Sequence, residues 1–327
     1  MKVLLTGANG FVGSSILDLL VERGHDVRIM LRKTSDTSRI TRHLPRADVR
    51  YGSLDDPDAL GQAVRDVECV VHCAGKTKVL CVEEYYAANR DGTRRVVEAA
   101  NANADSLRHF VHISSRAVNG PTTTARPARE NDPCLPISDY GKSKLEGERV
   151  VTGQCRVPWT VLRPSAVYGP GDTDFLHAFR AVRMRLMPLF DGGRQEINLV
   201  YVRDVAEAVL RCTGEEKAFG KTYNVASPDS STARELVEEI ARQMNVRALP
   251  LWLPGVALWP VCLVSEAASR VTGKPSILSR QKFQELRATG WVCSVERIRQ
   301  DLGFVAATPL PEGIRRTLAW YREAGWL

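Results

Sequence analysis

At positions 6–13 the chain reads Thr6-Gly7-Ala8-Asn9-Gly10-Phe11-Val12-Gly13, directly after an apolar run that we predict to be a strand, Lys2–Thr6. Ser14–Arg23 follows with the apolar spacing of an amphipathic helix. Glycines between a strand and a helix permit a tight turn and let the backbone approach a pyrophosphate, which the free N–H groups of the helix N-terminus attract. The sequence therefore predicts a dinucleotide-binding turn; the alternative is a plain glycine-rich connection.

Beyond this turn, short apolar runs alternate with amphipathic segments through the first half of the chain. Strands that alternate with helices form a parallel sheet with helices on both faces, so the predicted fold class is α/β with a doubly wound parallel sheet. The predicted strands are Lys2–Thr6, Asp26–Leu31, Val49–Tyr51, Cys69–Ala74, Phe110–Ser114, Trp159–Arg163 and Lys221–Ala226. The predicted helices are Ser14–Arg23, Asp58–Val64, Glu83–Asn101, Ser138–Val151, Val202–Thr213, Ala233–Met244 and Pro311–Ala324.

The pattern loosens after Arg163, where prolines and glycines crowd residues 164–171 and 188–193. We therefore predict a nucleotide-binding domain over residues 1–165, to which later strands and a helix from about 198–226 return. Residues 166–197 and 227–327 are predicted to form a smaller, mixed substrate lobe. The most apolar stretch of this lobe, Leu249–Val264, contains three prolines and is too short for a membrane-spanning helix.

Composition excludes several classes of protein. The 327 residues carry a net charge of +7 and are 44% hydrophobic, an ordinary balance for a folded chain rather than a disordered one. The chain has no block of like charge and no aromatic–basic platform, so we expect no nucleic-acid partner. The eight cysteines form no Cys-x-x-Cys pair and no zinc-like spacing, which predicts no metal site and a reducing, cytoplasmic compartment. No charged-then-apolar leader precedes Lys2, so no signal peptide is expected.

Two cations, Arg32 and Lys33, follow the second predicted strand, Asp26–Leu31. In dinucleotide-binding folds, a carboxylate about 20 residues past the glycine turn holds the ribose 2′-hydroxyl of NAD. Cations at this place suit the 2′-phosphate of NADP instead, so NADP(H) is favoured over NAD(H). Two alternatives are a solvated basic pair and a guanidinium stacked on the adenine of NAD.

Two further motifs place polar side chains where catalysis is expected. His112-Ile113-Ser114-Ser115 closes a predicted strand, and ligands of open α/β sheets lie beyond such carboxyl ends. Tyr140 and Lys144 are four residues apart and share one face of the helix that begins at Ser138. A free phenol has a pKa of about 10. A neighbouring ammonium lowers that pKa, so Tyr140 is expected to exchange a proton with a substrate oxygen that Ser115 also hydrogen-bonds. The alternative is that Tyr140 and Lys144 are ordinary surface residues.

Together these motifs resemble the extended short-chain dehydrogenase/reductase (NAD-dependent epimerase/dehydratase) family, and most of all its hydroxysteroid dehydrogenase-like and dihydroflavonol reductase-like branch. The resemblance rests on Thr6–Gly13, His72-Cys73-Ala74-Gly75, Asn89, Tyr140 with Lys144, Arg163–Gly171 and Tyr201–Ala206. It implies a Rossmann-type fold and an NAD(P)-dependent oxidoreductase in which Ser115, Tyr140 and Lys144 are catalytic. It also implies cofactor contacts from Gly7, Asn9, Gly10, Phe11, Val12, Gly13, Arg32, Lys33, Ser53, Leu54, Ala74, Gly75, Asn89, Ser114, Tyr140, Lys144, Pro164 and Val167.

Two positions depart from the family pattern. Ser53 stands where family members usually have an aspartate that contacts the adenine, which weakens the expected adenine contact there. Asn119 stands where sugar-nucleotide members often have a tyrosine. Arg116 follows Ser115 directly, and no acidic pair stands there, so a dehydratase reaction is not expected.

The apolar stretch around Leu249–Val261 resembles the lid of hydroxysteroid dehydrogenase-like members and favours a lipophilic ketone or secondary alcohol as substrate. The same stretch also fits the core of the lobe or a peripheral contact with a membrane surface. Arg194 and Arg203 are candidate phosphate ligands, so a nucleotide-sugar epimerase stays open. A non-catalytic, cofactor-binding protein is a further alternative, against which the intact Tyr140–Lys144 pair argues. By resemblance, the helices predicted at Glu83–Asn101 and Ser138–Val151 imply a homodimer.

Overall fold

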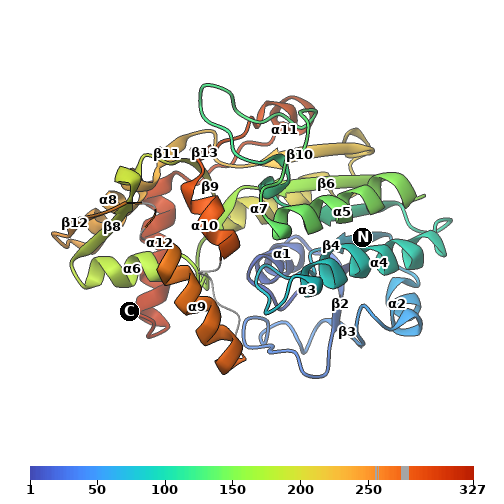
Figure 1. The fold of residues 1–327 in the computed structure, drawn as a ribbon. Coiled ribbons are helices and arrows are strands. Elements are labelled where there is room, and N and C mark those ends of the chain that lie inside the picture. Colours follow the sequence, from blue (N-terminus) through green and yellow to red (C-terminus); the bar gives the residue numbers. More distant parts are fainter. Residues whose placement is uncertain (255, 257, 274–279) are drawn as a thin grey trace.

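The first layer of the fold is a seven-stranded, all-parallel sheet, seen in a computed structural model that describes residues 1–254, 256, 258–273 and 280–327 (Figure 1). The strand order is β10-β6-β5-β4-β1-β2-β3, so the chain starts in the middle and winds outward in both directions. This is the doubly wound arrangement that the sequence predicted. The strands are β1 Lys2–Thr6, β2 Asp26–Leu31, β3 Asp48–Tyr51, β4 Cys69–His72, β5 His109–Ile113, β6 Trp159–Pro164 and β10 Lys221–Val225.

Helices cover both faces of this sheet, because its strands are apolar on both sides. One face packs against α1 (Phe11–Glu22) and α7 (Val202–Cys212), which together bury a core that includes Leu17 and Val205. The other face packs against the helices α2 Pro57–Val64, α4 Gly92–Asn101 and α5 Asp139–Gln154. The carboxyl ends of the strands stay uncovered by these helices, as expected for a ligand-binding edge.

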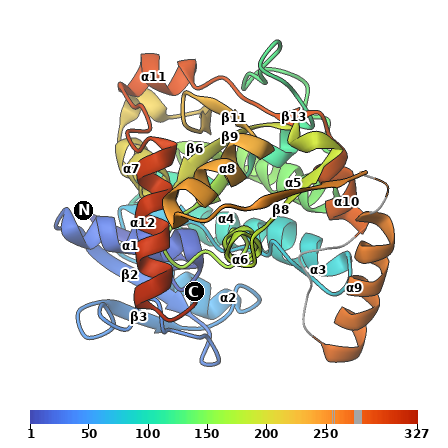
Figure 2. The same cartoon turned by 90° about the vertical axis from the view of Figure 1, so that its left-hand side faces the viewer.

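The second half of the chain adds a smaller lobe with its own core (Figures 1 and 2). A small sheet joins β11, β9 and β13 and, through β9, also β7; a separate parallel pair joins β8 and β12. The strands are β7 Ala166–Tyr168, β8 Leu186–Phe190, β9 Glu196–Tyr201, β11 Ser230–Thr232, β12 Leu249–Leu253 and β13 Gly290–Trp291. The helices are α6 Leu176–Arg183, α8 Ala233–Met244, α9 Leu258–Thr272, α10 Arg280–Arg287, α11 Glu296–Leu302 and α12 Leu310–Glu323. Figure 2 shows α12 and the α9–α10 pair on opposite flanks of this lobe.

Several sequence predictions need correction. The helix predicted at Glu83–Asn101 is three segments, α3 (Glu83–Tyr86), a π-helical turn (Ala87–Asp91) and α4. Helix α1 begins at Phe11 rather than Ser14, inside the glycine stretch. Strand β9, predicted to return to the first sheet, pairs with β7, β11 and β13 instead. The other strands of the lobe were not predicted, because two to five residues are too few to show a periodic pattern of apolar side chains; they are β7, β8, β11, β12 and β13.

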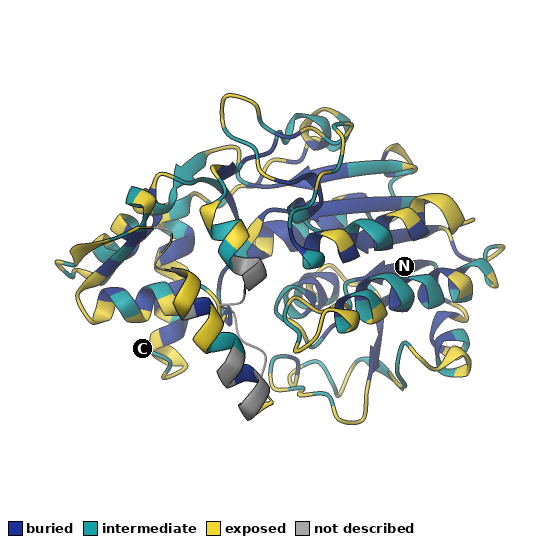
Figure 3. Ribbon diagram, viewed as in Figure 1, coloured by how far each residue is buried: buried dark blue, intermediate teal, exposed yellow. Residues whose placement is uncertain are grey.

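The apolar stretch 249–264 forms β12 and the first part of α9, and its residues 255 and 257 lie outside the described residues. Leu249, Leu251 and Trp252 are exposed, and Figure 3 shows exposed (yellow) residues along both elements. The interpretation of this stretch as lobe core is therefore wrong for β12.

Candidate active site

The glycine turn is shaped by two glycines that leave no room for a side chain. Gly7 has a φ of +73°, and a Cβ there would lie 2.6 Å from the backbone nitrogen of Ala74. A Cβ on Gly13 would lie 2.0 Å from the carbonyl oxygen of Gly7. Helix α1 has Gly10 as its N-cap, with no side chain capping its first N–H groups. The turn thus presents free backbone donors at a helix N-terminus, which suits a pyrophosphate.

This turn lies at the point where the winding of the sheet reverses. The neighbouring strands β1 and β4 are parallel, with Thr6 opposite His72 in the register. The loop after β4 brings the backbone of Ala74 beside the turn at Gly7, and Gly75 follows it. A Cβ on Gly75 would lie only 2.7 Å from Asn89 Oδ1, so a larger residue there would have to displace the Asn89 side chain; Lys144 Nζ would lie 3.9 Å away, in ordinary contact.

Asn89 connects three segments around the site from its buried position in the π-helical turn. Its Oδ1 accepts a hydrogen bond from the backbone N–H of Lys76 at 2.9 Å, and its Nδ2 donates to the Lys76 carbonyl oxygen at 3.0 Å. Nδ2 also donates to Ser143 Oγ at 2.9 Å, and that hydroxyl donates to the carbonyl oxygen of Tyr140 at 2.8 Å. The loop after β4 and helix α5 are therefore fixed relative to each other by one side chain.

A second set of hydrogen bonds runs through His72 and was not predicted from the sequence. Thr6 Oγ1 accepts from the backbone N–H of Ala74 at 3.3 Å and contacts His72 Nδ1 at 2.8 Å. His72 Nε2 contacts Thr93 Oγ1 at 3.1 Å, and Thr93 donates to the Asn89 carbonyl oxygen at 2.8 Å. Since Thr93 uses its proton on Asn89, His72 Nε2 must donate and Nδ1 must accept from Thr6. Burial lowers the pKa of His72 to about 3, which keeps the ring neutral as this arrangement requires.

The three predicted catalytic residues come together at the carboxyl end of β5. Ser115 caps a short 3₁₀ turn after β5, and its Oγ accepts from the backbone N–H of Ala117 at 3.2 Å. Tyr140 lies in the first turn of α5, which Ser138 caps. One turn later, Lys144 is buried and its Nζ donates to the carbonyl oxygen of Ile113 at 2.6 Å.

The electrostatics differ in one respect from the sequence expectation. Burial raises the pKa of Tyr140 to about 12, although a hydrogen bond with Ser115 opposes the rise, and the Glu285 carboxylate adds to it. Burial lowers the pKa of Lys144 to about 8, against the opposing effect of Cys73 and Glu148. The expected lowering of the Tyr140 pKa by Lys144 is not found, because the phenol is desolvated and the Lys144 ammonium is directed at the Ile113 carbonyl oxygen. At neutral pH the phenol holds its proton and is ready to donate it.

Two residues near Tyr140 were missed by the sequence reasoning. The ring of Tyr85 lies 5.9 Å from the Tyr140 ring, and its hydroxyl donates to the Thr77 carbonyl oxygen at 3.1 Å. Glu285 on α10 is near enough to raise the pKa of both tyrosines. No motif surrounds either residue, so only the packing of α3 and α10 reveals them.

The remaining predicted cofactor contacts are spread over the same edge of the sheet. Arg32 and Lys33 are exposed after β2, next to a loop that Asn9 holds by donating to the Asp36 carbonyl oxygen at 3.0 Å. Ser114 Oγ is buried without a hydrogen-bond partner among the described residues. Ser53 accepts from the backbone N–H of Asp55, Leu54 packs beside Gly92, Pro164 ends β6 and Val167 lies in β7.

These residues fit a dinucleotide cofactor. The glycine cradle, the uncapped N-terminus of α1 and the buried Ser114 hydroxyl offer the close approach and the donors that such a molecule needs. When bound, the nicotinamide supplies or accepts a hydride. The protein then contributes position and proton transfer.

The candidate phosphate ligands of the sugar-nucleotide alternative lie elsewhere. Arg203 forms an ion pair with Glu22 at 2.6 Å, at the opposite end of α1 from the glycine turn. Arg194 donates to the carbonyl oxygen of Asp191 at 3.2 Å in the β8–β9 connection. Asn119 is buried, and neither atom of its amide has a partner among the described residues.

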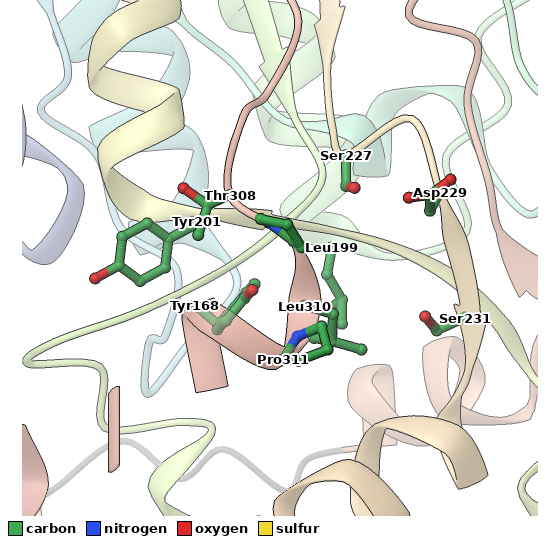
Figure 4. Close-up of a pocket in the computed structure, with 10 residues that line it drawn as sticks. Tyr168, Leu199, Tyr201, Ser227, Asp229, Ser231, Thr308, Leu310 and Pro311 are labelled. Atoms are coloured by element: carbon green, nitrogen blue, oxygen red, sulfur yellow. The ribbon is translucent and has the colours of Figure 1, made fainter. Parts of the chain in front are cut away.

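A cavity of about 120 Å³ lies in the lobe, away from these residues (Figure 4). Its lining is Tyr168, Leu199, Tyr201, Ser227, Asp229, Ser231, Thr308, Pro309, Leu310 and Pro311. None of the predicted catalytic or cofactor residues lines it. Across the part of the chain that the structure describes, no helix has the length and apolar character needed to span a membrane.

Comparison with known proteins agrees with this geometry. Residues 3–226 match the NAD dependent epimerase/dehydratase family. The chain is 29% identical to a ceramide reductase of Caulobacter vibrioides, over 99% of this chain and 96% of the relative. It is 26% identical to a UDP-glucose 4-epimerase of Vibrio cholerae, over 99% and 96%. Among solved structures, gox2253 superposes with a TM-score of 0.81 at 28% identity and covers 99% of this chain and 98% of its own. The chain is therefore an NAD(P)-dependent oxidoreductase that belongs to the NAD-dependent epimerase/dehydratase family.

Proposed function

We propose that this protein interconverts a secondary alcohol and a ketone on a lipophilic molecule and prefers NADP(H) to NAD(H). The proposal depends above all on one observation, the convergence of Ser115, Tyr140 and Lys144 beside Gly75 at the carboxyl ends of β4 and β5. In the reductive direction Tyr140 donates its proton to the carbonyl oxygen of the substrate while Ser115 hydrogen-bonds the same oxygen. With its pKa raised by burial, the phenol is fully protonated at neutral pH and needs no prior deprotonation for this step.

Two features support a lipophilic substrate over a nucleotide sugar. Arg203, a candidate phosphate ligand, is already paired with Glu22 at a distance from the site. An aromatic ring, that of Tyr85, lies beside Tyr140 instead. The ceramide reductase among the relatives acts on a lipid by its name, and the similarity to it extends over nearly the whole of both chains. The epimerase relative keeps a nucleotide sugar as the second candidate.

The proposed preference for NADP(H) rests on Arg32 and Lys33. These exposed cations directly follow β2, at the place where an NAD-binding fold usually has a carboxylate. We expect Arg32→Asp to weaken the binding of NADPH by tenfold or more, and to leave the binding of NADH unchanged or tighter. Fluorescence titration with both cofactors measures this directly. Equal losses for the two cofactors would remove the basis of the preference.

The proposed reaction is tested by a ketone screen with reduced cofactor, followed at the absorbance of the reduced nicotinamide. Long-chain acyl ketones and sterol-like ketones form one arm, and UDP-glucose with detection of UDP-galactose forms the other. Tyr140→Phe is expected to lower turnover by about a hundredfold or more and to keep cofactor affinity. Full turnover by that variant would overturn the mechanism, and epimerisation without net cofactor oxidation would favour the second candidate.

We further propose a homodimer formed through α4 and α5, which pack side by side on the outer face of the sheet. Arg94 and Arg149 on these helices already pair within the chain, with Asp91 and Glu146 respectively, so the proposal rests on the family resemblance and on the side-by-side packing of the two helices. Light scattering of the purified chain measures the oligomeric state. A monomer at micromolar concentration would refute this part of the proposal.

A further inference from the structure

The parallel pair β8–β12 presents a continuous apolar face to the outside of the lobe. Its register places Leu249 beside Leu186, Leu251 beside Pro188 and Leu253 beside Phe190. Paired residues of parallel strands share one face and alternate residues the other. Met187 and Leu189 are 7% and 1% exposed and pack into the lobe core, so the six paired residues lie on the opposite side. On that side Leu186, Leu249 and Leu251 are 39%, 71% and 43% exposed.

This outer face lies at the end of the molecule farthest from the first sheet (Figure 1). Met184, two residues before β8 begins, is a further exposed apolar residue. The next helix in the chain, α9, begins five residues after β12 ends and exposes Trp259, Leu263 and Val264. Large exposed apolar side chains that share one face, as Leu186, Leu249 and Leu251 do on β8–β12, mark a contact with a partner or a membrane.

Three arginines stand at one edge of the outer face. Arg183 and Arg185 precede β8, and Arg247 precedes β12. Since the two strands are parallel, their first residues lie side by side, and the backbone N–H of Leu249 donates to the Arg185 carbonyl oxygen at 2.9 Å. All three arginines are exposed, and none forms an ion pair within the described part of the chain.

An apolar face with an unpaired cationic edge is complementary to an anionic lipid bilayer. Leucine side chains gain by entering the acyl boundary, and each arginine near the surface gains from the negative potential of the headgroups. A second copy of this chain is disfavoured as the occupant, because a two-fold contact would bring the two cationic edges to the same interface.

We propose that the outer face of β8–β12, with Arg183, Arg185 and Arg247, docks this protein on the surface of anionic membranes. Membrane binding by this face does not depend on which reaction the protein catalyses. The further idea that binding gives the active site access to a lipophilic substrate in the bilayer rests on the proposed function.

The test is sedimentation of the full chain with vesicles of phosphatidylcholine and phosphatidylglycerol, compared with vesicles of phosphatidylcholine alone. We expect binding to the mixed vesicles that weakens as salt is added. Replacing the three arginines by glutamine is expected to weaken it about a hundredfold. The double variant Leu249→Asp/Leu251→Asp is expected to weaken it by about the same factor or more, because apolar contact is lost and negative charge is added.

Val305→Asp is the matched control, since Val305 is an exposed apolar residue (46%) in the loop between α11 and α12. It should bind vesicles like the unaltered chain. Circular dichroism and NADPH affinity, measured on every variant, separate loss of docking from loss of the fold. Vesicle binding that the leucine and arginine variants leave intact would overturn the proposal. The proposal would also be overturned if the leucine variant lost self-association of the chain but kept vesicle binding. Failure of the ketone screen would refute the proposed function without changing the vesicle result.

Discussion

Replacing Lys144 would measure how much the candidate active site lowers the free energy of unfolding. Burial lowers its pKa from 10.5 to about 8. Each pKa unit corresponds to about 1.4 kcal/mol, so holding the charged ammonium inside the folded protein at neutral pH costs about 3 kcal/mol. Lys144→Met removes this cost and keeps a side chain of similar shape, but it also leaves the Ile113 carbonyl oxygen without the hydrogen bond at 2.6 Å, a loss of about 1 kcal/mol. We therefore expect the variant to be about 2 kcal/mol more stable than the unaltered chain at pH 7.

The pH dependence gives the sharper signal. Below the folded pKa both states hold the proton, and the full cost is present. As the pH rises from about 8 to 10.5 the folded lysine becomes neutral while the unfolded one stays charged, so the cost fades. The advantage of Lys144→Met should therefore shrink and change sign over this range. Urea unfolding at about pH 7, 8.5 and 10, without cofactor, measures it.

Lys142→Met is the control, because Lys142 is exposed on the same helix and only pairs with Asp139 at 3.4 Å. Its effect should stay within about 0.5 kcal/mol at every pH. A stability difference for Lys144→Met that does not change with pH would refute the reasoning, as would a variant that is less stable at neutral pH. Lys144→Met should also lose turnover, because the buried ammonium that lowers the stability of the fold is needed for the proposed reaction.

Three further outcomes are expected. Arg163→Met should destabilise the fold by about 3–5 kcal/mol in urea unfolding, because it leaves the buried Glu148 carboxylate without its partner at 2.7 Å; pairing it with Glu148→Gln should restore most of the loss. Thr93→Val should cost about 1–3 kcal/mol and lower kcat by leaving His72 Nε2 unpaired, whereas Thr93→Ser should remain close to the unaltered chain in both measurements. Gly13→Ala should abolish measurable NADPH binding in a fluorescence titration, and retained affinity would contradict the predicted role of the turn.

Local sequence was enough to predict the succession of strands and helices along the first half of the chain. It also predicted that Ser115 follows a strand and that Tyr140 and Lys144 lie in the first turns of a helix. Apolar runs and helical spacing are properties of neighbouring residues, so Lys2–Thr6, Asp26–Leu31 and Ala233–Met244 have the bounds that the sequence predicted. The glycine turn was predictable for the same reason, because glycines directly between a strand and a helix permit a tight turn there. The spacing of Tyr140 and Lys144 fixed their common helix face.

Other features depended on contacts between distant segments. The partner of β9, the outward face of β12 and the position of Glu285 near Tyr140 are decided by how the lobe packs, and short strands have no period that predicts this packing. The raised pKa of Tyr140 is the clearest case. The sequence placed an ammonium four residues away and predicted a lowered value, but only the tertiary structure decided how far the phenol is buried and where Lys144 points. Desolvation acts through the whole surrounding structure, whereas residue spacing along a helix describes two side chains alone.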